Sequence, residues 1–221
     1  MTSQLDNLLS IAYHIVRGDY DLTIFLLTKC LTTLRAEVVM KMVEENSSWV
    51  AASSEDIVEI HFAATAKSSE YFRNQGRIPI FDQPLVVRCA LGVVVPPETL
   101  SFVAMYNLAL AYQLKYYHEE IQNVSNLRKA ANLYKCSHDV VCSQRVKISA
   151  IHLFTLITNL ASAEEAILGK EKGRLYLDRA LSIYMFMKYG CVEKDLPESL
   201  CFFLWSVFPF LLPAPEVAPA A

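Results

Sequence analysis

The apolar residues of this 221-residue chain recur every three or four positions along most of its length, a spacing typical of helices that bury one face. Glycine or polar residues interrupt the pattern at short intervals, so we expect neighbouring helices to pair as antiparallel hairpins. The spacing predicts helices over residues 5–16, 20–42, 98–117, 124–141, 145–168, 171–188 and 199–208. The first six of these helices would form three hairpins.

Residues 46–97 follow a different pattern. The stretch IVEIHF alternates at period two, and RIPIFDQPLVVRCALGVVVPPE contains valine-rich runs bounded by prolines. Both patterns favour short strands or extended segments, so we expect a β hairpin or an irregular excursion after the first helical hairpin. A long disordered loop is the competing interpretation for residues 46–54, where serine and alanine dominate.

These patterns predict a mainly all-α fold with a small β-containing insertion. We expect one domain over residues 1–221, because domains commonly contain about 100 to 200 residues. Its parts would be a first hairpin, the excursion, two further hairpins, an apolar cap and a loose tail, at residues 1–45, 46–97, 98–189, 190–212 and 213–221.

Small residues stand beside large ones at regular positions in the paired helices. Closely packed helices need this arrangement, because a small side chain lets the second backbone approach and a large one fills the remaining gap. The pattern occurs at Leu108, Ala109 and Tyr112 with Ala130, Tyr134 and Ser137, at Gly18, Tyr20, Thr23, Leu27 and Cys30, and at Leu156, Ile157 and Leu160 with Gly173, Leu177 and Ala180.

This pattern resembles the tetratricopeptide repeat (TPR) over about residues 5–35, 103–140 and 151–187, roughly half the chain. The chain is also similar to divergent, uncharacterised TPR-like proteins of algal genomes. Its hairpins are spaced further apart than the regular repeat of about 34 residues. The resemblance therefore implies an irregular stack of TPR-like helix-turn-helix hairpins instead of a smooth superhelix.

The resemblance also implies that ligands lie in a groove lined by the first helix of each hairpin. Such a groove would be apolar, so we expect a hydrophobic peptide, a helix or another copy of the chain as the partner. Asn107 falls where family members grip a peptide carboxylate, but the matching positions of the first hairpin are apolar. Burial of the same side chains by neighbouring segments is the alternative. The expected groove residues are Val103, Tyr106, Asn107, Leu110, Gln113, Leu114, Ile151, Phe154 and Thr158.

Catalytic and metal-binding patterns are weak in this sequence. His138 and Cys142, four residues apart, would share a helix face, whereas Cys136 would not join them as a third zinc ligand. The other histidines are scattered, and the sequence has no glycine-rich phosphate loop. We therefore expect a non-enzymatic scaffold for protein binding, with no catalytic residues, no metal and no cofactor. An enzyme with its site in residues 46–97 is one alternative.

Charge and hydrophobicity restrict the partners and the location. The net charge of −3 does not indicate nucleic-acid binding. Residues 200–212 are apolar but shorter than the about 20 residues that span a membrane, so spanning is not expected. A membrane-peripheral or membrane-anchored protein using this segment is a second alternative.

Six irregularly spaced cysteines and an amino terminus unlike a secretory signal predict an intracellular protein, cytoplasmic or nuclear. Trp49 and Trp205 are expected to be partly buried anchors.

Overall fold

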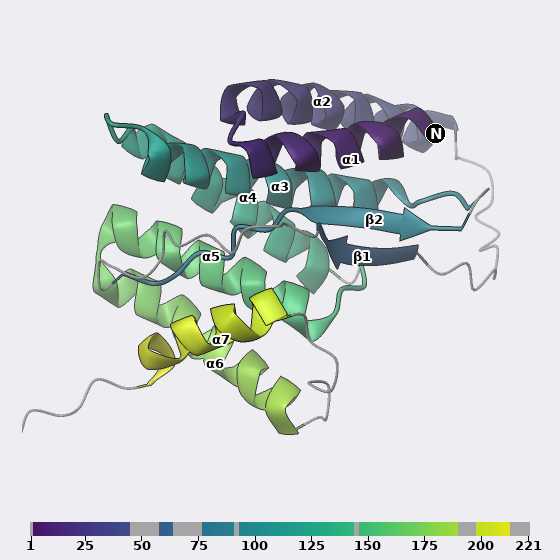
Figure 1. Cartoon of the computed structure of the whole chain (residues 1–221). Coiled ribbons are helices and arrows are strands. Elements are labelled where there is room, and N and C mark those ends of the chain that lie inside the picture. The colour runs from purple at the N-terminus through teal and green to yellow at the C-terminus, as the bar shows by residue number, and fades with distance from the viewer. Residues whose placement is uncertain are drawn as a thin grey trace, which may run out of the picture. The chain divides into compact units, whose positions relative to one another are not determined.

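The computed structural model describes residues 2–44, 58–63, 77–90, 93–143, 146–189 and 198–212. The described residues are mainly helical, and the predicted fold class is confirmed (Figure 1). In chain order the elements are α1 (Thr2–Arg17), α2 (Tyr20–Glu44), β1 (Val58–Phe62), β2 (Leu85–Cys89), α3 (Pro97–His118), α4 (Val124–Cys142), α5 (Ala150–Leu168), α6 (Lys170–Tyr189) and α7 (Glu198–Leu211).

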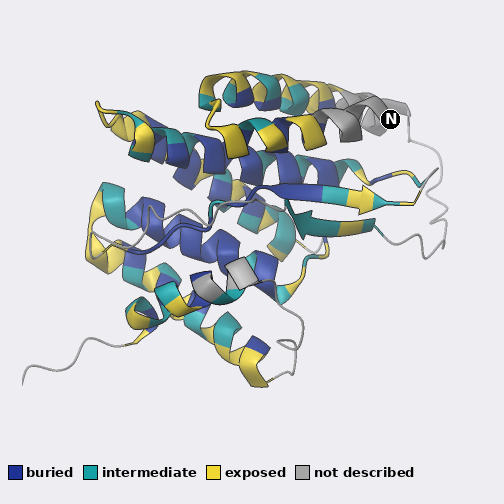
Figure 2. Cartoon of the chain, viewed as in Figure 1, coloured by how far each residue is buried: buried dark blue, intermediate teal, exposed yellow. Residues whose placement is uncertain are grey.

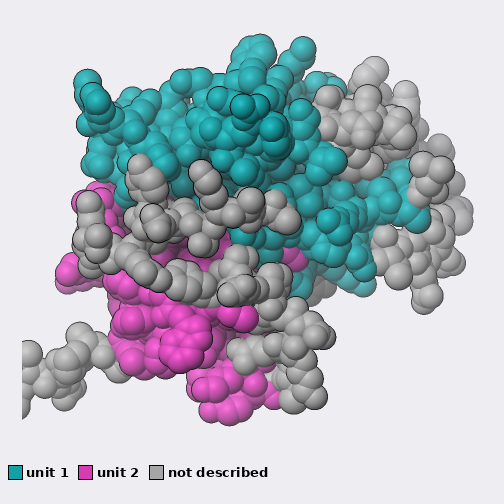
Figure 3. Space-filling model, viewed as in Figure 1, with its two compact units in different colours: residues 1–67, 82–149 teal, residues 68–81, 150–221 magenta. Residues whose placement is uncertain are grey.

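The chain is divided into two compact units (Figure 3). The first unit is Met1–Lys67 with Asp82–Ser149, and the second is Ser68–Phe81 with Ala150–Ala221. The second unit is therefore discontinuous in sequence, because a segment from the middle of the chain belongs with the last three helices. The expected single domain stays a prediction, since compact units can belong to one domain.

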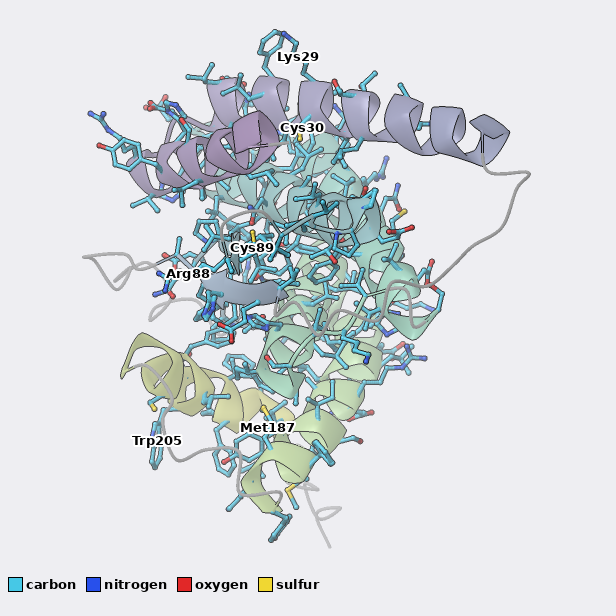
Figure 4. All side chains as sticks on the ribbon, turned by 90° about the vertical axis from the view of Figure 1, so that its right-hand side faces the viewer. Lys29, Cys30, Arg88, Cys89, Met187 and Trp205 are labelled. Carbon is cyan, nitrogen blue, oxygen red and sulfur yellow. The ribbon has the colours of Figure 1, made fainter. Side chains whose placement is uncertain are left out.

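In the first unit, α1 and α2 form the first hairpin. Gly18 adopts φ 82° in the connecting turn, a left-handed conformation that glycine reaches without steric cost. Both helices pack on α3 through one apolar core. Its buried members are Leu8, Ile11, Leu27, Leu34, Val95, Leu100, Ala104 and Leu108. In Figure 4 Lys29 points away from the protein, whereas the next residue, Cys30, points inward, where it packs against this core.

The expected β structure is a two-stranded antiparallel sheet in the first unit. β1 and β2 pair from Val58 opposite Cys89 to Phe62 opposite Leu85. The strands lie far apart in the sequence, so no tight turn joins them. Trp49 and the proposed loop at 46–54 lie outside the described residues.

The central hairpin, α3 and α4, completes the first unit. Pro97 occupies the first turn of α3, where its missing N–H costs no helical hydrogen bond. Asn123 caps α4, because its side-chain oxygen accepts a hydrogen bond from the Ser125 N–H at 3.0 Å. Figure 2 shows that α3 is buried along most of its length.

In the second unit, α5 and α6 form the third hairpin, and α7 packs on α6. Gly169 joins the hairpin with φ 92°. The predicted start of α5 at residue 145 is wrong, because helical geometry begins at Ala150. Ser149, a residue type favoured immediately before a helix, precedes this start.

The small and large positions predicted for helix contacts are buried, except for half-buried Tyr112 and Cys30 and the turn residues Gly18 and Tyr20. The expected burial of Trp205 is wrong. Its side chain is 78% exposed and extends outward from α7 (Figure 4). Among the described residues, no helix combines the length and the apolar character that crossing a bilayer requires.

Candidate functional site

Helices α3 and α5, the first helices of the second and third hairpins, carry all nine residues expected to line a groove, and every one of them is buried. Their exposed fractions are between 0 and 8%. The expectation of an open groove is therefore corrected, because these side chains contact the protein's own segments. Tyr106, for example, packs edge-on against the ring of Tyr134 at 5.8 Å between ring centroids. The Tyr134 hydroxyl in turn donates a hydrogen bond to Gln113 Oε1 at 2.9 Å.

Asn107 of α3 binds the backbone of an extended segment within the first unit. Its Oδ1 accepts a hydrogen bond from the Leu85 N–H at 2.8 Å, and its Nδ2 donates to the Leu85 carbonyl at 2.8 Å. A side-chain amide offers one acceptor and two donors, so it can satisfy both backbone groups of one residue. Asn107 was expected to line an apolar groove for a partner, and in this structure it holds the start of β2.

Asn159 of α5 makes the equivalent contact within the second unit. Its Oδ1 accepts from the Phe81 N–H at 2.8 Å, and its Nδ2 donates to the Phe81 carbonyl at 3.0 Å. We call residues 78–81 the strap. Ser162 Oγ donates to the Ile78 carbonyl at 3.0 Å, and Glu165 Oε2 accepts from the Ile78 N–H at 3.1 Å. One helix face thus binds four backbone groups of the strap.

The strap-binding residues of α5 were not found from the sequence. The signal that could have found them is a recurring tripeptide, Asn-Leu-Ala, which occurs at 107–109 and again at 159–161. The repeat pattern described above instead matched Leu156 to Leu108. With the tripeptides in register, both asparagines occupy the same position on the first helix of their hairpins, and both bind an extended segment.

A separate pocket lies at the turn of the first hairpin, within the first unit. Its volume is about 480 Å³. The Lys115 ammonium forms ion pairs with Asp21 and, at 3.4 Å, with Glu119. The hydrogen bond to Asp21 is the main reason that the pKa of Lys115 is raised. The pocket is lined by Val16, Arg17, Gly18, Tyr20, Asp21, Lys115, His118 and Glu119.

His118 lies at the edge of this pocket, against the ring of Tyr20 at 5.4 Å between ring centroids. Burial lowers the pKa of His118 below its ordinary value of 6.5, and the negative charge of Asp82 opposes that shift. The residues that line the pocket include two cations, Arg17 and Lys115, and two carboxylates, Asp21 and Glu119, so the pocket has a mixed charge. It therefore offers no clear preference for an anion or a cation.

His138 and Cys142 share an exposed face of α4, as the spacing predicts. Cys142 Sγ lies 3.4 Å from His138 Nε2. Cys136 is exposed on the same helix. In the part of the chain that the structure describes, no three histidine, cysteine, aspartate or glutamate side chains are grouped to hold a metal ion.

Comparison with known proteins identifies no relative. No family model, no curated protein and no solved structure matches the chain. The resemblance to the TPR family therefore stays a prediction.

Proposed function

We propose that this chain is a non-enzymatic protein-interaction module that binds an extended peptide segment along the first helix of a hairpin, α3 in the first unit or α5 in the second. The supporting observation is the pair of buried asparagines, Asn107 and Asn159, each of which binds the N–H and the C=O of one residue in an extended segment. Backbone groups are common to all peptides, so the same amides suit a segment of another protein or of a second copy of the chain.

A partner has to compete with the chain's own segment for these amides. The apparent affinity for a partner is the intrinsic affinity multiplied by the fraction of molecules in which the chain's own segment has left the position. Binding of a partner is therefore expected to be weak for the wild-type chain and tighter for a variant whose strap packs less tightly. Phe81→Ala is such a variant, because Phe81 is 3% exposed and its ring packs against Phe203 at 4.9 Å between centroids.

A peptide-library selection tests this proposal. A library of random displayed peptides is selected on the full-length Phe81→Ala chain, and the folded state of the chain is checked by circular dichroism. We expect enriched peptides that bind at least tenfold more weakly when Asn159→Ala is added. Asn132→Ala is the matched control, because Asn132 is an exposed asparagine on α4. Failure of the folded chain to enrich any peptide, or equal binding to both alanine variants, would contradict the proposal.

An intracellular, cytoplasmic or nuclear location is part of the proposal. Cys89, Cys136 and Cys142 are free thiols, and free thiols persist in reducing compartments. Labelling intact cells with a membrane-impermeant thiol reagent checks this. Reaction of Cys136 or Cys142 only after cell lysis is the expected result.

A membrane-peripheral role is the second candidate, and the exposure of Trp205 on α7 favours it. Trp205 is 78% exposed and Leu212 is 49% exposed. Tryptophan is enriched at membrane–water interfaces, because its ring is amphipathic. Vesicle sedimentation of the full chain, the Trp205→Ala variant and a chain ending at Ser199 tests it. Vesicle binding by the full chain but by neither variant would support this role. No binding by the full chain would exclude it.

A further inference from the structure

We propose that the strap-binding face of α5, formed by Asn159, Ser162 and Glu165, accepts a partner segment of a defined class. The class is an extended segment with an aliphatic residue, a proline immediately after it, and an aromatic residue three positions after the aliphatic one. The inference rests on the proposed function and adds the sequence pattern of the partner. The strap itself, Ile-Pro-Ile-Phe, provides the template.

The spacing of the hydrogen-bonding groups fits an extended chain that runs antiparallel to α5. Glu165 and Ser162 bind Ile78, and Asn159 binds Phe81. Six residues of helix, from Asn159 to Glu165, rise about 9 Å. Three residues of extended chain span about 10 Å. The two lengths match, so a partner segment can use the same groups with the same three-residue separation.

The aromatic position of the pattern comes from the surroundings of Phe81. The Phe81 ring packs against Phe203 of α7, and Phe203 packs edge-on against Phe154 of α5 at 6.2 Å between centroids. All three rings are at least nine-tenths buried. Tilted and edge-on aromatic pairs contribute more than their buried area alone, so the site favours an aromatic side chain over an aliphatic one here.

The aliphatic position comes from the surroundings of Ile78, which lies directly over the backbone of α6. A Cβ atom on Gly173 would lie 3.2 Å from Ile78 Cδ1 and 2.8 Å from Glu165 Cβ. The absence of a side chain at Gly173 therefore lets α5 and α6 approach closely and also leaves room for the end of the Ile78 side chain. Ile78 itself is 4% exposed.

The proline position follows from the hydrogen bonds of its neighbours. The strap donates the N–H groups of Ile78 and Phe81, and Pro79 has no N–H to satisfy in this buried setting. Proline also restricts the unbound peptide to extended conformations, which reduces the entropy lost on binding. A partner with proline at this position is therefore favoured.

Titration of a synthetic peptide tests the pattern. The probe is a fluorescent peptide with the sequence of residues 77–83, RIPIFDQ, added to the full-length chain carrying Ile78→Ala and Phe81→Ala. We expect binding at least tenfold tighter than to the wild-type chain, whose own strap competes. Replacing the phenylalanine of the probe by alanine, or its first isoleucine by aspartate, is expected to weaken binding at least tenfold.

The outcomes separate this inference from the proposed function. Equal binding of the probe and its alanine variant would overturn the pattern and leave binding through the backbone intact. No binding of any peptide to the folded variant would overturn both. If the variant does not fold, hydrogen exchange on the wild-type chain decides. Excess probe is expected to speed exchange of the Ile78 and Phe81 amides at least twofold, and unchanged exchange would contradict the inference.

Discussion

Single buried asparagines determine how extended segments are held in this protein. Asn107 and Asn159 are both fully buried, and each makes two hydrogen bonds to backbone groups. A buried N–H or C=O group that loses its hydrogen-bond partner costs about 1–3 kcal/mol of stability. Each asparagine supplies the partner for two such groups. In both cases a buried polar side chain fixes the position of an extended backbone segment.

Asn107→Ala is expected to lower the free energy of unfolding by about 2–4 kcal/mol, since the two backbone groups of Leu85 lose their partner. Asn132→Ala makes the same chemical change on an exposed helix face and should alter stability by less than about 0.5 kcal/mol. Urea denaturation of both variants measures the difference. Equal effects would show that the Asn107 amide does not hold β2.

The lowered pKa of His118 predicts a dependence of stability on pH. Because the folded state binds this proton less readily than the unfolded state, the stabilisation is fully present above about pH 6.5 and is lost as the pH falls through the lower pKa of the folded state. His118→Gln is expected to reduce the loss of stability on acidification. Urea midpoints measured from pH 7.5 downward test this, and parallel curves for both proteins would refute it.

At the scale of whole elements, the sequence predicted the helices and their pairing into hairpins, but not the extended segments that pack on them. The expected ends lie within a few residues of the observed ones, except at α5, because periodic apolar residues report the buried face of a helix locally. The extended strap could not be placed the same way. Its contacts with α5 join residues far apart in the chain, and the spacing of apolar residues does not show which distant segments pair.

The same lack of information on contacts between distant segments explains why the groove residues were expected to be open to a partner, although they are buried. Helical spacing placed Tyr106, Leu110 and Gln113 on one face of the helix, but it could not show that α3 is buried on nearly all sides. Asn107 was chosen by resemblance to a ligand-gripping position, and it does bind an extended segment, although that segment is the protein's own. The resemblance therefore drew attention to Asn107, but it predicted neither the two backbone hydrogen bonds nor Leu85 as the residue that makes them.

Arg174 of α6 anchors the end of α7. Its Nη1 donates hydrogen bonds to the carbonyls of Phe210 and Leu212, each at 2.9 Å, and its Nη2 donates to that of Leu211 at 3.3 Å. The last carbonyls of a helix lack helical partners, so a cation there satisfies them. Arg174→Ala is therefore expected to speed hydrogen exchange in residues 203–211 at least fivefold. Arg179→Ala, an exposed site on the same helix, serves as the control and should have no such effect.

At the scale of the whole molecule, the discontinuous second unit is the main feature. Residues 68–81 are separated in sequence from α5, α6 and α7, yet they belong to the same compact unit. Helix propensity alone rarely stabilises short helices, so packing of the strap is expected to contribute to this unit. The strap therefore has two roles, as a structural part of the unit and as the template for a partner.

Fragments of the second unit test the structural role. Residues 150–221 alone are expected to melt at least about 5 °C lower than the same fragment with residues 68–81 attached through a flexible glycine–serine linker. The physical reason is that the lone fragment leaves the strap-binding face of α5 uncovered. Circular dichroism melting curves provide the measurement, and identical curves would show that the strap adds nothing to this unit.

The central claim is that the Asn159 amide binds the backbone of a partner peptide. Replacing the amide N–H of the phenylalanine in the 77–83 probe by an ester oxygen removes the hydrogen bond equivalent to Phe81 N–H to Asn159 Oδ1 and leaves every side chain of the probe unchanged. The ester is expected to bind the Ile78→Ala, Phe81→Ala chain at least fivefold more weakly than the amide probe, with no difference once Asn159→Ala is added. An ester that binds as tightly as the amide would contradict the account.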